Sequence, residues 1–186
     1  MSERRGATAT SPAPTFEALC ADDAAFTAWY QAALPRVYGF VYARAGGDLS
    51  LTEDVTAHAF MEGVRARRSF DGRSDPVTWI CAIARNRLVD HYRAEAREGL
   101  RRLRLVEGFG EPSSSGGFDD LERRDAVLTL LGSLPGLERM ALTLRYLDGY
   151  SVPEVASLIG RSLPATESVL KRARERVRHA FPGGLG

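Results

Sequence analysis

Apolar residues recur at helical spacing along two stretches of this chain, and a segment rich in glycine, serine and proline separates the two stretches. In the first stretch, Phe26, Trp29, Tyr30 and Leu34 fall on one face of a helix because they are three, one and four residues apart. The separating segment, GFGEPSSSGGFDD at residues 108–120, has the composition of a linker. With 186 residues, 44% of them hydrophobic, the chain can bury two small cores. The pattern predicts an all-α protein of two small helical domains joined by a flexible linker.

The boundaries of these domains follow from the changes in composition. Residues 1–21 are rich in alanine, serine, threonine and proline, so we expect a flexible N-terminal tail there. The first domain is expected at residues 22–94 and the linker at residues 95–124. The second domain is expected at residues 125–181, and a short C-terminal tail follows at residues 182–186.

Three helices are expected in the first domain. The first of them should end at Gly46, and Pro35 within it should mark a joint or a kink. The second begins with Ser50 and Glu53, which have the spacing of a capping box: the serine caps the helix and the glutamate reaches back to a free backbone donor. The third is expected at residues 77–93.

The second domain should contain two amphipathic helices, at residues 127–134 and 137–147, followed by shorter segments. Ser151 and Glu154 form a second capping-box pattern that opens a short helix ending at Ile159. A glycine able to turn sharply comes next.

A short helix, a turn that contains Gly160, and a longer helix capped by Ser162 are typical of a helix-turn-helix. In this motif the second helix, here expected to run to about Ala180, lies in the major groove of DNA. Five residues of that helix should face the core: Leu163, Thr166, Leu170, Ala173 and Val177.

The opposite face of that helix carries polar and charged residues suited to DNA. Glu167 can accept a hydrogen bond from a cytosine amine, and Lys171 can reach guanine or phosphate. Arg174 and Arg178 lie further along and favour phosphate contacts. The alternative is that these arginines merely solvate a surface and complement the helix dipole. The predicted contacts are Glu167, Ser168, Lys171, Arg172, Arg174 and Arg178.

The charge balance restricts how the chain could bind nucleic acid. The formal net charge is +1, so binding would require basic residues gathered on one face. Lys171 is the only lysine among 25 basic residues. Arginine suits phosphate and guanine. However, because arginine is spread along the whole chain, the preferred explanation is a GC-rich genome, which favours arginine codons.

The sequence gives no sign of catalysis, metal binding or export. Cys20 and Cys81 form no CxxC pair, and no apolar run long enough for a signal peptide or a membrane span is present. No nucleotide-binding or hydrolase motif occurs, and His58, His91 and His179 lack an acid, base or nucleophile partner. We therefore expect a cytoplasmic protein with no catalytic residue, no metal and no cofactor.

Two longer stretches carry a family resemblance. Residues 52–93, which include TWICAIARN, and residues 131–178, which include LRYLDGYSVPEVA, resemble the extracytoplasmic-function (ECF) class of bacterial RNA polymerase sigma factors. This class is group IV of the primary-type sigma superfamily, and the likeness is to its actinobacterial members. The resemblance implies a sigma-2 domain that binds the clamp helices of the largest polymerase subunit and opens the −10 element. It also implies a sigma-4 domain that binds the flap of the second-largest subunit and reads the −35 element.

The resemblance also implies a role for individual residues of the first domain. A loop at residues 70–76 would capture a flipped −10 base, which requires an apolar wall and polar edges. Trp79 aligns with a tryptophan used at the melting fork, but it could equally be an ordinary core residue. The implied −10 contacts are Phe70, Arg73, Ser74, Asp75, Trp79, Arg85 and Asn86. The implied polymerase contacts are Asp54, Val55, Ala57, His58, Phe60 and Met61.

The chain departs from the family pattern at several of these positions. Ala57 and His58 replace a glutamine and an acidic residue, which changes the expected polymerase contacts. His58 is interpreted as a surface substitution because no second metal-binding residue has a matching spacing. Asp71, Arg73 and Pro76 alter the base-capture loop. Glu167 and Val169 replace residues that are often basic, which should change the −35 sequence that is read.

Two other functions remain open at this point. The chain could be a free-standing helix-turn-helix regulator that binds duplex DNA without the polymerase. It could also be an interaction module held by an anti-sigma protein, the partner that commonly inactivates this class, although the sequence identifies none. The expected partners are thus core RNA polymerase, promoter DNA and an anti-sigma protein.

Overall fold

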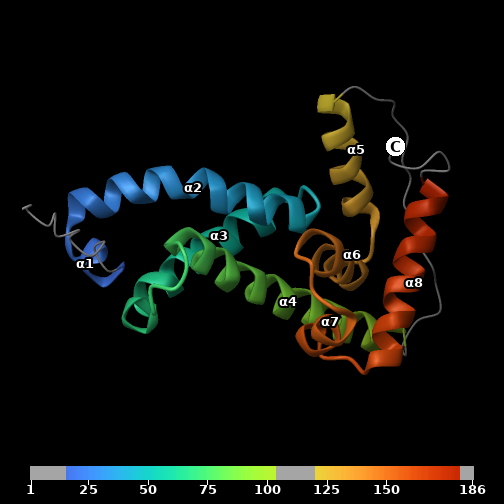
Figure 1. Ribbon diagram of the computed structural model, residues 1–186. Helices are drawn as coiled ribbons and strands as arrows, with labels where there is room; N and C mark the ends of the chain where they lie inside the picture. Colours follow the sequence, from blue (N-terminus) through green and yellow to red (C-terminus); the bar gives the residue numbers. More distant parts are fainter. Residues whose placement is uncertain (1–15, 104–119, 181–186) are drawn as a thin grey trace, which may run out of the picture.

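The computed structural model describes residues 16–103 and 120–180, and every regular element within them is helical (Figure 1). The predicted all-α fold class is therefore confirmed. The N-terminal half contains α1 (Phe16–Ala21), α2 (Asp23–Ala45), α3 (Leu49–Arg65), the short 3-10 helix η1 (Arg67–Ser69) and α4 (Pro76–Leu103). The C-terminal half contains α5 (Asp120–Ser133), α6 (Gly136–Leu142), the π-helical turn η2 (Thr143–Leu147), α7 (Val152–Ile159) and α8 (Leu163–Ala180).

Helices α2, α3 and α4 pack against one another and form the core of the N-terminal half. Val41, Val55, Ile80 and Leu88 are almost completely buried between them. The first predicted helix end is confirmed, because Gly46 ends α2 in the left-handed conformation that glycine adopts without strain. Pro35 lies inside α2, which continues past it to Ala45 rather than ending there.

Three features of this half differ from the sequence-based expectations. Asp48 caps α3 by accepting a hydrogen bond from the Leu51 amide at 2.9 Å, so the predicted cap at Ser50 is wrong. Residues 16–21 of the predicted tail form α1, whose Phe16 side chain is only 1% exposed. Helix α4 continues to Leu103 and so extends into the predicted linker, whose central residues 104–119 lie outside the described structure.

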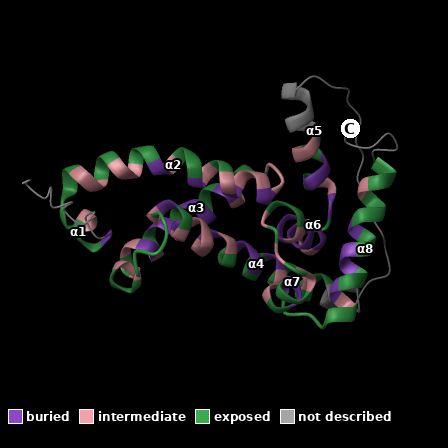
Figure 2. Ribbon diagram, in the orientation of Figure 1, coloured by how far each residue is buried: buried purple, intermediate pink, exposed green. Residues whose placement is uncertain are grey.

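The C-terminal half packs directly on the N-terminal half. Helix α4 runs from the first half to lie against α6 and α7, and α5 contacts α2 (Figure 1). Figure 2 shows buried residues along α3, α4, α5 and α6, and α4 contacts both α3 and α6. One cluster of buried apolar residues extends from Val41 in α2 through Tyr92 in α4 to Met140 in α6. The two helical units therefore share buried surface.

Charged side chains hold this junction together. The Arg44 guanidinium forms an ion pair with Asp148, and both side chains are only 10% exposed. Arg139 donates hydrogen bonds to the backbone carbonyl of Ala45 and to the Tyr92 hydroxyl, the latter at 3.1 Å. Burial raises the pKa of Tyr92 to about 12, although the nearby Arg139 charge opposes that rise.

Two glycines allow the closest backbone approach at this junction. A Cβ atom on Gly132 would lie 2.8 Å from the carbonyl oxygen of Gly46, and a Cβ atom on Gly46 would lie 2.8 Å from the Gly132 nitrogen. Real Cβ atoms do not approach backbone atoms this closely, so a larger residue at either position would separate α2 from α5.

Cys20 and Cys81 are both free thiols, and burial raises the pKa of each. Among the helices of the described ranges, none combines the length and apolar character needed to cross a membrane. The same ranges contain no group of three His, Cys, Asp or Glu side chains placed to hold a metal ion.

Candidate nucleic-acid interface

Helices α7 and α8 form the predicted helix-turn-helix. The Glu154 carboxylate accepts hydrogen bonds from the Ser151 amide at 2.8 Å and from the Ser151 hydroxyl at 2.6 Å, which confirms the capping box. These hydrogen bonds lower the pKa of Glu154. Gly160 ends α7 in the left-handed conformation, and the Ser162 hydroxyl accepts from the Ala165 amide at 3.4 Å to cap α8. Local sequence signals therefore fix both ends of the turn.

The buried face of α8 orients the rest of the helix. Thr166, Leu170 and Ala173 are buried, as expected. Val169 is also buried, at 5% exposure, whereas Leu163 is 44% exposed, so the buried stripe is displaced from the predicted one. Val169 therefore belongs to the core of this helical unit, and the expected effect of its replacing a basic residue stays a prediction.

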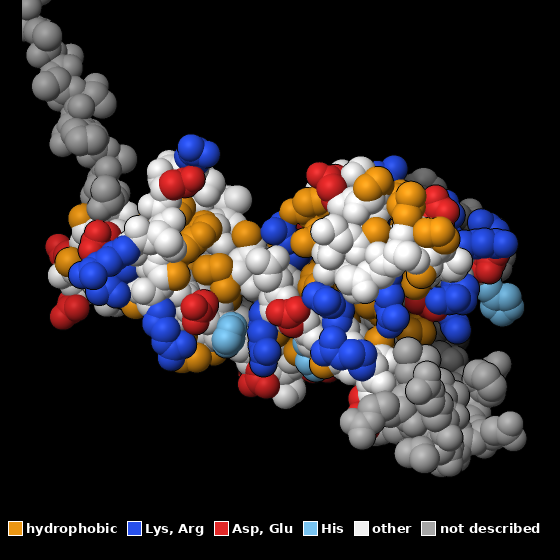
Figure 3. Space-filling model, turned by 90° about the horizontal axis from the view of Figure 1, so that it is seen from below, with side chains coloured by type: hydrophobic (Ala, Val, Ile, Leu, Met, Phe, Trp, Pro, Cys, Tyr) orange, Lys and Arg blue, Asp and Glu red, His pale blue; other side chains and the backbone are white. Residues whose placement is uncertain are grey.

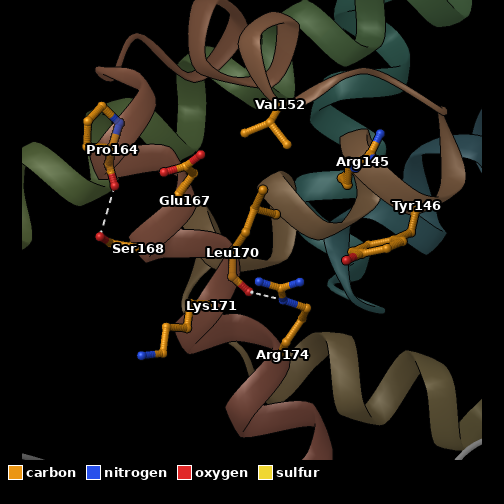
Figure 4. Close-up of a pocket in the computed structure, with 9 residues that line it drawn as sticks. All are labelled: Arg145, Tyr146, Val152, Pro164, Glu167, Ser168, Leu170, Lys171 and Arg174. Atoms are coloured by element: carbon orange, nitrogen blue, oxygen red, sulfur yellow. Dashed lines mark hydrogen bonds between the residues drawn. The ribbon is translucent and has the colours of Figure 1, made fainter.

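The outward face of α8 borders an open groove of about 600 Å³ (Figure 4). Glu167, Ser168, Lys171 and Arg174 line it from α8, and Arg145 lies across from them. The Ser168 hydroxyl donates to the Pro164 carbonyl at 2.9 Å, and Arg174 Nε donates to the Leu170 carbonyl at 3.2 Å. Four of the six predicted −35 contacts therefore lie together on one surface.

Arg172 lies on a different side of α8 from that groove. Its Nε atom is 3.4 Å from the Glu138 carboxylate on α6, and Arg176 Nε is 3.1 Å from the other oxygen of the same carboxylate. The Glu138 side chain is only 9% exposed, whereas both arginines are about half exposed. Arg172 therefore attaches α8 to α6. Glu138 and Arg176 were not predicted, because the pairing joins residues 34 or more positions apart. Arg178 is exposed.

Basic residues on the surface are interspersed with other side chains rather than gathered over one whole face. On the face that Figure 3 shows, Lys and Arg side chains alternate with acidic and hydrophobic ones from one end of the molecule to the other. This agrees with a net charge of only +1. Attraction to DNA must therefore come from small groups of basic residues such as those on α8.

The loop at residues 70–76 is held in shape by its own acidic residues. Asp71 accepts from the Arg73 amide at 3.0 Å, and Gly72 between them has a φ of +72°. Asp75 accepts from the Val77 amide at 3.1 Å, and its carboxylate also lies 3.4 Å from Arg36 of α2. Arg73 and Ser74 are exposed at the tip of the loop. The loop thus presents polar groups on a structured backbone.

Phe70 and Trp79 contact each other beside this loop. Their ring centroids are 5.2 Å apart, and both rings also lie 5.7 Å from the ring of Phe16 in α1. Both residues are partly buried. Trp79 is therefore part of an aromatic cluster, and its contact with DNA stays a prediction.

The other two predicted −10 contacts on α4 differ in their surroundings. Asn86 is exposed. Arg85 is partly buried and donates a hydrogen bond to the Tyr150 hydroxyl, which belongs to the C-terminal half. In this arrangement the Arg85 guanidinium is engaged by the protein itself.

The predicted polymerase contacts on α3 fall on two faces of that helix. Asp54, Ala57 and Met61 are exposed, and Met61 is 55% exposed although it is apolar; His58 is partly buried. Val55 and Phe60 are 2% and 5% exposed and belong to the core. A direct polymerase contact by Val55 or Phe60 is therefore not available in this conformation, because their side chains pack between helices.

Two family models match this chain. The first, Sigma-70 region 2, covers residues 29–98, and the second, Sigma-70 region 4, covers residues 124–177. Among curated proteins, the ECF RNA polymerase sigma factor SigC of Mycobacterium tuberculosis (strain CDC 1551 / Oshkosh) is 31% identical over 133 residues, which are 69% of each chain. The chain belongs to the ECF RNA polymerase sigma factor family.

Further relatives of this sigma factor cover more of its length. The ECF RNA polymerase sigma factor SigK of Mycobacterium sp. (strain JLS) is 29% identical over 83% of this chain and 80% of the relative. The ECF RNA polymerase sigma factor BldN of Streptomyces coelicolor is 30% identical over 85% of this chain and 61% of the relative. Among solved structures, the sigma factor RpoE of Bartonella quintana, in complex with the anti-sigma factor NepR, aligns with 85% of this chain and 97% of that chain, at 22% identity and a TM-score of 0.48.

The family matches contain the surfaces described above. The region 2 match includes α3, the loop at residues 70–76 and most of α4, and the region 4 match includes α7 and most of α8. As a sigma factor, the protein directs RNA polymerase to promoters, and a regulator without a polymerase role is not favoured because a region 2 match is present.

Proposed function

We propose that this sigma factor reads the −35 element through the outward face of α8 and the −10 element through the loop at residues 70–76, while α3 contacts core RNA polymerase. The observation that carries this proposal is that Glu167, Ser168, Lys171 and Arg174 line one groove on the second helix of a helix-turn-helix. That helix is the one which enters the major groove in this motif. Arg178, exposed one turn further on, would contact phosphate.

Each proposed DNA surface suits a different task. Lys171 and Arg174 can neutralise phosphates or reach guanine, and Glu167 can accept from cytosine. Arg73 and Ser74 are exposed at the loop tip, where they could bond to the edge of a base taken out of the stack. We assign Arg172 to holding α8 against Glu138, because its guanidinium already has that carboxylate as a partner.

The proposed polymerase surface is the exposed side of α3. Asp54 and Ala57 lie there, and the half-exposed side chain of Met61 is apolar, as expected of a contact point for another protein. By the family resemblance, α3 would contact the clamp helices of the largest subunit, and the C-terminal helical unit would contact the flap of the second-largest subunit. An anti-sigma protein is a further partner that the resemblance implies, and it stays a prediction.

We further propose that the factor carries out no chemistry of its own and needs no cofactor, because its task is to bind polymerase and promoter. That task places it in the cytoplasm, where both are found. Two of the proposed surfaces, on α8 and on the loop at residues 70–76, would bind promoter DNA, and the third, on α3, would bind core polymerase.

Transcription in vitro from a library of genomic fragments, with purified core polymerase, tests this proposal. Core plus the sigma factor should start transcripts at discrete sites, whereas core alone should not. The double variant Asp54→Ala, Met61→Ala should lose core binding and keep its fold. If the isolated protein binds duplex DNA tightly, and this variant leaves its regulatory effect unchanged, the protein acts as a free-standing regulator and the proposal is wrong.

A further inference from the structure

Helix α1 places an aromatic side chain against both ends of the segment that holds the −10 loop. The Phe16 ring lies 5.7 Å from Phe70, which opens the loop, and 5.7 Å from Trp79, in the first turn of the helix that follows it. Its distance to Trp29 of α2 is 5.1 Å. All three contacts are edge-on, the arrangement that aromatic rings prefer. At 1% exposure, Phe16 is among the most buried side chains of the chain's described part.

A second side chain of α1 contacts the residues just before this loop. Glu17 forms an ion pair of 3.0 Å with Arg68, a residue of η1 immediately before the loop. Figure 1 shows α1 beside the start of α2, and α1 contacts both α2 and η1. At the far end of the loop, Asp75 is held by Arg36 of α2. The loop backbone is thus fixed at its entrance by α1 and at its exit by α2.

We propose that Phe16 is a positioning residue for base capture at the −10 element. It sets the place of Phe70 and Trp79, and through them the place of the exposed loop tip at Arg73 and Ser74. This inference rests on the proposed function, because it concerns the loop assigned there to the −10 element. Phe16 itself touches no DNA in this account.

A positioning role and a purely structural role make different predictions. If Phe16 only stabilises the fold, its loss reduces the amount of active protein and lowers initiation equally on every promoter. If Phe16 positions the loop, its loss also reduces discrimination between bases at the captured position. A group displaced by about 1 Å can lose on the order of 100-fold in effect, so a fall of about tenfold in the discrimination ratio is a measurable expectation.

The experiment compares variants of the full-length sigma factor bound to core polymerase. The template is a promoter obtained from the genomic-fragment selection, in four versions that differ only at the captured −10 base. The measured quantity is the ratio of initiation on the preferred base to initiation on the others. Phe16→Ala is compared with Phe26→Ala, which also removes a phenylalanine ring, but from α2. Phe26 contacts Trp29 and Tyr30, and no ring contact joins it to Phe70 or Trp79.

We expect Phe16→Ala to lower the ratio about tenfold. We expect Phe26→Ala, and Phe16→Leu, which keeps a large apolar side chain at this position, to leave the ratio near the wild-type value. An unchanged ratio for folded Phe16→Ala, or an equal fall for Phe26→Ala, overturns the inference. If circular dichroism shows that Phe16→Ala does not fold, Phe16→Val takes its place in the experiment. An unchanged ratio for Phe16→Val, or an equal fall for Phe26→Ala, then overturns the inference. Failure of the wild-type protein to initiate at all would instead overturn the proposed function.

Discussion

Tyr92 should make the stability of this protein fall steeply at alkaline pH. Its ring is 2% exposed at the junction between the two helical units, and burial raises its pKa from 10.0 to about 12. Because the folded state holds the phenol proton more tightly than the unfolded state does, the stabilisation is fully present below pH 10. It is lost as the pH rises through 12.

The magnitude follows from the two pKa values. A rise from 10.0 to about 12 corresponds to about 3 kcal/mol of unfolding free energy, most of which is lost by pH 12. At neutral pH, Tyr92→Phe removes the hydrogen bond donated by Arg139 at 3.1 Å and the longer one donated to the Arg44 carbonyl at 3.4 Å. We expect that loss to cost about 1–2 kcal/mol.

Urea unfolding of the wild type and of Tyr92→Phe between pH 8 and pH 12 tests this reasoning. The wild type should be the more stable protein at pH 8, and the order should reverse near pH 12 because phenylalanine does not titrate. Tyr146→Phe is the matched control, since it removes the phenol hydroxyl of a residue that is 59% exposed rather than of one buried at the junction. A difference between wild type and Tyr92→Phe that stays constant over this range would refute the argument.

Five further variants test three other features of the structure. Glu138→Gln should lower the free energy of unfolding by about 1–2 kcal/mol, a moderate loss because the two arginines that pair with Glu138 are half exposed. Calorimetry should show a Tm lowered by about 2–8 °C. An unchanged Tm would show that these ion pairs do not stabilise the fold. Gly46→Ala should destabilise the fold by more than about 1 kcal/mol, since its φ is +68° and its Cβ would meet backbone; Gly39→Ala, with open space around it, should instead stabilise α2 slightly in the same chemical denaturation assay. Lys171→Ala and Arg174→Ala should each lower the number of ions released on promoter binding by about one. Fluorescence titrations measure this number as the slope of the logarithm of the binding constant against the logarithm of the salt concentration. If neither slope changes, these residues do not contact DNA.

Local signals in the sequence predicted the helix-turn-helix well. The Ser151 and Glu154 capping box, the turn at Gly160 and the cap at Ser162 all depend on residues within four positions of one another. Such contacts are set by backbone geometry and need no knowledge of the rest of the fold. The cap of α3 was misplaced because Asp48 and Ser50 are both good capping residues, and only the structure shows which of them reaches the free amide.

Contacts between distant residues could not be predicted in this way. Arg139 bonds to a carbonyl 94 positions away, and Glu138 pairs with arginines on another helix. Phe16 was assigned to a tail because the residues before it have the composition of one, although its own ring is buried by aromatic residues far along the chain. The family resemblance implied that α3 contacts the polymerase, but it did not indicate that Val55 and Phe60 of this helix are buried.

Sequencing of transcript 5′ ends from a randomised promoter library tests the central claim most directly, namely that one chain reads two separate promoter elements. With core polymerase, the sigma factor should select two sequence motifs, upstream near −35 and downstream near −10. Lys171→Ala combined with Arg174→Ala should weaken only the upstream motif, and Arg73→Ala only the downstream one. Selection of a single palindromic motif, or the loss of both motifs in either variant, would contradict the account.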